Sequence, residues 1–182
     1  MIEIVLQYYA NERQFALVGV GIGVVLVILA AILWRTSEVA SLGAGMAYFL
    51  MIAGMLQATA SFSYMRLVNR RAELVAKTYV GQSEAEIKRQ ELVRMHRVLK
   101  SGYTGALVTY SAFLLIGAAL VFIAGDVPIW KGVALALMIV GVIGHCIEAF
   151  SMQENRQYLH EVDSRPVPVE MPHLTEKEEW NQ

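Results

Sequence analysis

The residues of this chain most capable of chemistry are polar side chains within long apolar segments. His145 and Glu148 are three residues apart, so they share one face of a helix. Hydroxyl and amide side chains accompany them in the same segments, at Gln57, Thr59, Ser61, Ser63, Thr109 and Ser111. An ionisable group inside a membrane is costly and usually faces other helices or water. We predict that these eight residues form an intramembrane polar cluster, with Glu148 either buried among helices or reaching the lipid headgroups.

This cluster does not predict catalysis or metal binding. A metal site needs three or four protein ligands, and His145 is the only histidine in an apolar segment. Cys146 is the only cysteine, which excludes a disulfide framework and a thiolate zinc site. The chain has no GxSxG, Walker or HExxH motif and no Cys-His pair in plausible register. We therefore expect a protein that is not an enzyme and that holds no cofactor or metal.

Four apolar segments, at residues 15–34, 39–64, 104–125 and 130–150, have to position these side chains. Each reaches the roughly 20 residues that a helix needs to cross ~30 Å of hydrocarbon. The apolar runs are continuous rather than alternating, so they predict helices and not barrel strands. Hydrophobic residues make up 56% of the 182 residues and charged residues 17%, which is a membrane composition. The sequence predicts an all-α integral membrane protein with a bundle of four transmembrane helices.

Positive charge concentrates between the second and third segments. Residues 65–102 hold nine of the fifteen lysines and arginines, and the positive-inside rule places them in the cytoplasm. With four spans, both termini then also lie in the cytoplasm, and we expect a bacterial inner-membrane protein. Eight basic residues are candidates for contact with anionic lipid headgroups or with a partner, namely Arg66, Arg70, Arg71, Lys88, Arg89, Arg94, Arg97 and Lys100. The net charge of −1 gives no indication of nucleic-acid binding.

The segments outside the membrane have patterns of their own. Residues 65–102 predict a cytoplasmic helical hairpin that extends the second and third spans, with Gly81 ending one arm in a left-handed conformation. Ser83 and Glu86 form a capping-box pattern that starts the other arm. Residues 1–14 predict a short amphipathic helix in the membrane interface. We expect residues 151–182 to form a cytoplasmic tail that is disordered beyond about 163.

Small residues recur along the spans. Such residues let helices approach closely in lipid. We predict that they mark helix contacts at Gly19, Gly23, Ser41, Gly45, Gly117, Gly141 and Gly144.

These observations favour binding over catalysis. The leading hypothesis is a protein that binds another protein in or beneath the bilayer, because the overall plan resembles that of some four-span immunity proteins against pore-forming toxins. That resemblance is one of architecture and not of motif. The alternatives are a small channel or transporter subunit, acting as a homo-oligomer, and a membrane scaffold for assembly or signalling. A lipid-processing enzyme is the weakest alternative.

Overall fold

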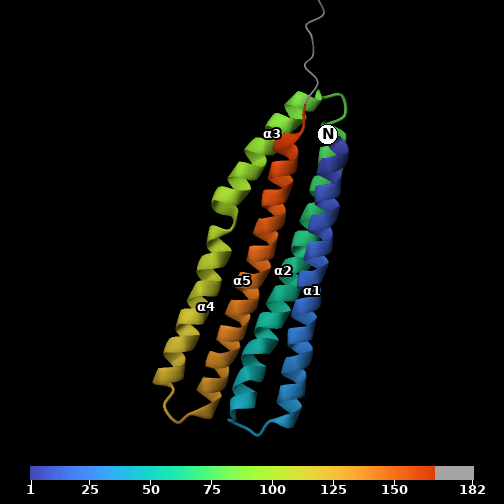
Figure 1. Cartoon of the computed structure of the whole chain (residues 1–182). Helices are drawn as coiled ribbons and strands as arrows, with labels where there is room; N and C mark the ends of the chain where they lie inside the picture. Colours follow the sequence, from blue (N-terminus) through green and yellow to red (C-terminus); the bar gives the residue numbers. More distant parts are fainter. Residues whose placement is uncertain (167–182) are drawn as a thin grey trace, which may run out of the picture.

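The fold is helical throughout the part of the chain that the structure describes (Figure 1). The computed structural model describes residues 1–166. Its elements are α1 (Ile2–Thr36), α2 (Leu42–Thr78), α3 (Glu84–Arg97), the π-helical turn η1 (Val98–Gly102), α4 (Thr104–Ile123) and α5 (Pro128–Ser164). Four helical stretches are long and apolar enough to cross a membrane: α1, α2, α5, and α3 with η1 and α4 taken together. The structure therefore confirms the expected all-helical fold, with four helices able to cross a membrane among residues 1–166.

The long helices lie side by side in the order α4, α5, α2, α1 (Figure 1). α1 packs along α2, α2 packs against α5, and α4 packs mainly against α5. The turns joining α1 to α2 and α4 to α5 lie at one end of the molecule, and the N-terminus and α3 lie at the other. Contact between α1 and α5 is sparse. This sparse contact leaves a groove between α1 and α5, in which the candidate site lies.

The N-terminal residues continue the first span. α1 begins at Ile2 and runs without a break to Thr36, so residues 1–14 are not a separate amphipathic helix in the membrane interface. Their apolar stripe is buried in the protein instead, with Val5 fully buried and Tyr8 and Tyr9 nearly so. The reason is that the other helices also extend beyond the apolar segments and offer this stripe a protein surface to pack on.

Local signals explain where the helices end. Ser41 caps α2, because its Oγ accepts a hydrogen bond from the backbone N–H of Ala44. Ser41 therefore caps α2, and Val39 lies in the preceding turn and is 99% exposed. Gly81 has a φ of +84°, the left-handed conformation that its position predicted, and Ser83 caps α3 through the N–H of Glu86. Ser151 to Ser164 belong to α5, while the expected disorder beyond 163 falls largely on residues 167–182, outside the described residues.

The helices approach one another closely at glycines. A Cβ at Gly23 would lie 2.5 Å from the backbone N of Ala58, and a Cβ at Gly45 would lie 1.9 Å from the carbonyl O of Ile129. Six more glycines have neighbouring-helix atoms in the space a Cβ would take, namely Gly19, Gly54, Gly117, Gly132, Gly141 and Gly144. Small residues allow this backbone contact, which replaces the hydrophobic effect as the source of helix association in lipid.

Two separate groups of buried residues hold the helices together. One lies within the apolar spans and joins α1, α2 and α5 through Leu26, Leu50 and Ala136. The other lies at the end that holds the N-terminus and joins α1, α2, α3 and α5 through residues such as Val5, Ile87 and their neighbours. α3 packs on α5 at this end. The second group therefore builds a helical body beyond the apolar spans, and the candidate site lies on it.

Candidate functional site

A buried carboxylate organises the body beyond the spans. Glu91 of α3 is fully buried. The hydroxyls of Tyr79 and Tyr158 donate hydrogen bonds to its two oxygens, each at 2.8 Å. Arg94 donates from Nε at 3.0 Å and from Nη2 at 2.5 Å to Glu91 Oε2. A buried carboxylate with this many hydrogen-bond partners is well compensated, so Glu91 is a structural anchor.

Aromatic rings surround the guanidinium of Arg94. Its Cζ lies 5.0 Å from the ring centre of Tyr8, 5.4 Å from that of Tyr9 and 5.9 Å from that of Tyr158. The Tyr8 and Tyr158 rings stack with their centres 4.1 Å apart. Burial and then the charge of Glu91 raise the pKa of Tyr158, so its hydroxyl stays a neutral donor. These contacts join α1, α3 and α5, and Arg94 faces the core rather than lipid or a partner.

A second buried carboxylate lies nearer the apolar spans. Glu12 of α1 is only 6% exposed, and Tyr64 of α2 donates a hydrogen bond to its Oε2. On the neighbouring helices, Tyr103 hydrogen-bonds Ser151 at 3.0 Å and accepts a hydrogen bond from Asn155. All five residues lie at the boundary where the apolar segments end. Unlike Glu91, Glu12 has no basic partner within residues 1–166.

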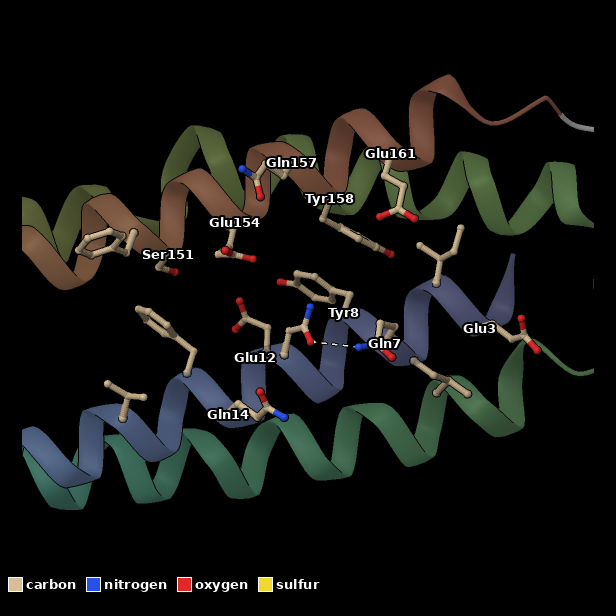
Figure 2. Close-up of a pocket in the computed structure, with 16 residues that line it drawn as sticks. Glu3, Gln7, Tyr8, Glu12, Gln14, Ser151, Glu154, Gln157, Tyr158 and Glu161 are labelled. Atoms are coloured by element: carbon tan, nitrogen blue, oxygen red, sulfur yellow. Dashed lines mark hydrogen bonds between the residues drawn. The ribbon is translucent and has the colours of Figure 1, made fainter.

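Glu12 opens onto a groove of about 1080 Å³ between α1 and α5 (Figure 2). The groove is lined by four carboxylates, four amides and four aromatic rings, with Ser151 and a few apolar side chains. The carboxylates belong to Glu3, Glu12, Glu154 and Glu161, the amides to Gln7, Asn11, Gln14 and Gln157, and the rings to Tyr8, Phe15, Phe150 and Tyr158. Figure 2 shows Glu12 and Glu154 pointing from the two helices into the space between them. The groove exists because α1 and α5 make only sparse contact with each other.

The groove is acidic, because four glutamates and no lysine or arginine of residues 1–166 line it. None of its four carboxylates forms an ion pair within residues 1–166. Glu3, Glu154 and Glu161 are exposed, whereas Glu12 is buried at the base. One end of the groove is apolar, at Phe15, Val18 and Phe150, where the spans begin. Such a surface can attract cationic and amphipathic ligands.

The structure divides the expected intramembrane polar cluster into separate pairs. The Nε2 amide of Gln57 donates to Ser61 Oγ at 3.1 Å beside Gly19 of α1, while Ser111 and His145 hydrogen-bond at 3.2 Å between α4 and α5. Thr59 and Thr109 are exposed and bond their own helix backbones, Ser63 is exposed, and Glu148 is half-buried. Because α4 packs mainly against α5, its polar residues do not meet those of α2.

The basic residues also divide into distinct environments. Lys88 donates to the carbonyl oxygens of Asp163 and Arg165 at the end of α5, and Arg89 pairs with Glu86 on its own helix. Six of the predicted contact residues remain exposed, namely Arg66, Arg70, Arg71, Arg89, Arg97 and Lys100. All but Arg89, which pairs with Glu86, have no ion-pair partner within residues 1–166.

The groove carboxylates were not among the residues that sequence reasoning singled out. A signal for them is present: the polar residues Glu3, Gln7, Asn11 and Gln14 recur at helical spacing, as do Glu154, Gln157 and Glu161. Each set forms one stripe on its helix. That the two stripes face each other depends on tertiary packing.

Comparison with known proteins gives no functional lead. The chain matches no protein-family model, no curated protein and no solved structure. Among residues 1–166 no group of three or more His, Cys, Asp or Glu side chains could hold a metal ion. The interpretation of function therefore depends on the geometry of the groove and on the charge distribution.

Proposed function

We propose that the chain is a bacterial inner-membrane protein with both termini in the cytoplasm. The nine basic residues between the second and third spans support this orientation through the positive-inside rule. In it, the ends of α2 and α3 form the cytoplasmic hairpin, and the helical body with its acidic groove lies beneath the bilayer. The exposed Arg66, Arg70 and Arg71 then lie at the level of the anionic inner leaflet, where each basic residue contributes about 1 kcal/mol of attraction.

Within that membrane the protein acts without catalysis, by binding another protein in or under the bilayer. The observation that carries this proposal is the open groove between α1 and α5, whose carboxylates have no cationic partner in residues 1–166. Four like charges along one groove repel each other and are best relieved by an oppositely charged ligand. Its apolar end at Phe15 and Phe150 suits a ligand that also enters or touches the membrane.

The concrete form of this function is immunity against a membrane-acting toxin. At the opposite end of the molecule only two short turns, 37–41 and 124–127, connect the helices. A specific interface usually buries ~800 Å² per partner, which such turns cannot supply. Recognition therefore uses the spans or the cytoplasmic body, and an intruding toxin segment in the inner membrane would meet both.

The test is protection of living cells. The chain is expressed with the membrane-acting toxin encoded next to its gene, and membrane potential is followed with a voltage-sensitive dye. Cells should stay polarised with the full chain and depolarise without it. If no neighbouring toxin is neutralised, and the reconstituted protein instead conducts ions in a manner abolished by Glu148→Gln, the channel alternative replaces this function.

A further inference from the structure

We propose that the groove between α1 and α5 binds a basic amphipathic helix of about 11–15 residues, supplied by a protein partner. This inference rests on the proposed function and specifies the chemistry of the partner at that site. It follows from the length of the groove, the spacing of its charges and the position of its apolar end.

The length of the groove matches three to four turns of helix. Its α1 wall extends from Glu3 to Val18 and its α5 wall from Phe150 to Glu161. At ~1.5 Å rise per residue these walls are about 22 Å and about 16 Å long. A bound helix parallel to them would span the same length with about 11–15 residues.

The charges define the polar face of that helix. Glu154 and Glu161 are seven residues apart on α5, and Glu3 and Glu12 are nine apart on α1. Lysines or arginines seven residues apart lie two turns apart on the same face of a helix. A ligand helix with one such basic face can therefore contact the carboxylates of both walls. Among the groove carboxylates, Glu12 should gain most from a cationic partner. It is 6% exposed, and Tyr64 is its only hydrogen-bond partner within residues 1–166. A buried carboxylate with one neutral donor gains from a charged one.

The polar residues along the groove favour a polypeptide over a lipid as its occupant. From Phe15, at the edge of the apolar span, the groove continues to Glu3, about 18 Å further by helical rise. A phospholipid headgroup at the membrane surface would cover only the first part of this length. An anionic headgroup would also be repelled by the carboxylates.

A separate partner is favoured over a second copy of the chain. The basic residues of α2 and α3 lie on helices whose opposite faces are buried in the protein's own core, through Val68, Ile87 and Met95. A second copy would therefore have to bring a whole helical body to a groove between two helices. A single helix fills such a groove without that obstruction.

The experiment uses a defined peptide as the probe. A fluorescent 14-residue Leu/Lys peptide, with lysines seven residues apart on one face, is titrated into the full chain in phosphatidylcholine nanodiscs, with empty nanodiscs as background. Fluorescence anisotropy should show saturable binding. Glu154→Gln with Glu161→Gln should weaken it about 3- to 10-fold, the effect of two exposed ion pairs. The matched control, Glu38→Gln with Glu73→Gln, removes the same charge from exposed sites outside the groove and should leave the affinity unchanged.

Three results would overturn the proposal. The groove variant could bind the peptide as tightly as the unmodified chain, or a peptide with glutamate in place of lysine could bind equally well. Alternatively, native mass spectrometry could find a retained phosphatidylethanolamine that is lost in the groove variant, which would make the occupant a lipid.

The toxin assay separates this inference from the proposed function. Full protection in the groove variant, with peptide binding weakened as expected, would leave the function standing and refute the groove as its binding site. Peptide binding that follows the predicted pattern in a chain that protects no cell would support the groove and refute the immunity function.

Discussion

Replacing Gly45 by alanine should separate α2 from α5. A Cβ at Gly45 would lie 1.9 Å from the carbonyl O of Ile129, and the nearest ordinary contact distance is 3.4 Å. The obstacle is backbone and not the end of a flexible side chain, so the helices must move apart by about 1.5 Å. Gly132 makes the reciprocal contact, with a Cβ 2.0 Å from the carbonyl O of Leu42. At this crossing, therefore, the backbone of each helix leaves no room for a Cβ on the other.

The change in the free energy of unfolding caused by Gly45→Ala combines two opposing effects. Overpacking of a close contact costs about 1–3 kcal/mol, whereas alanine in place of glycine in a helix gains about 1 kcal/mol. Gly45→Ala should therefore lower the free energy of unfolding by up to about 2 kcal/mol. Gly21 is the matched control, because nothing lies within 4 Å of a Cβ there. Gly21→Ala should raise the free energy of unfolding by about 0.5–1 kcal/mol.

Equilibrium unfolding in mixed detergent micelles, followed by circular dichroism, measures both variants against the unmodified chain. The two variants should differ by about 1–3 kcal/mol, the cost of overpacking, which is a roughly 5- to 150-fold difference in the unfolding equilibrium. If Gly45→Ala unfolds at the same detergent fraction as Gly21→Ala, the close α2–α5 crossing is not what holds these helices together.

Three further predictions concern the body beyond the spans and the orientation of the chain. Glu91→Gln should cost about 3 kcal/mol of unfolding free energy by leaving Arg94 without its carboxylate, and adding Arg94→Leu should recover part of the loss in the same denaturation assay. Burial and then Glu91 raise the pKa of Tyr158 above its ordinary value of 10.0, so its contribution to stability is fully present below pH 10 and is lost as the pH rises through the folded-state pKa; Tyr158→Phe should flatten this alkaline decline in unfolding midpoints. Reporter fusions at Ser37 should read as external and at Gln82 as internal, and an external signal at Gln82 would reverse the proposed topology.

The sequence predicted the apolar helical segments correctly, but it did not predict how far some of these helices extend beyond those segments. The apolar segments indicated four helices able to cross a membrane, but residues 1–14 were interpreted as a separate interfacial helix, whereas α1 runs unbroken from Ile2 to Thr36. An apolar stripe with buried Val5 and Tyr9 would suit a membrane surface equally well. Only the other helices that extend to the same level turn this stripe into part of a protein core.

The candidate site was harder to predict because polarity alone does not say which residues meet. Gln57 and Ser61 bond each other, and Ser111 bonds His145, yet the two pairs remain apart. Arg94 has the same charge as its exposed neighbours on α3 but turns inward to Glu91 and the tyrosine rings. Which partners a polar side chain finds depends on the lateral order of the helices.

The sequence by itself determined that this chain has four helices long and apolar enough to cross a membrane, because hydropathy and length are properties of consecutive residues. It also determined the cap of α3 at Ser83 and the left-handed backbone of Gly81 in the turn after α2, because both depend on local chemistry. Only the tertiary structure decided that Glu12 and Glu154 face each other across a groove, although they are far apart in the chain. The polar stripes on α1 and α5 are visible in the sequence, but their alignment depends on α2 separating the two helices just enough to leave the groove open.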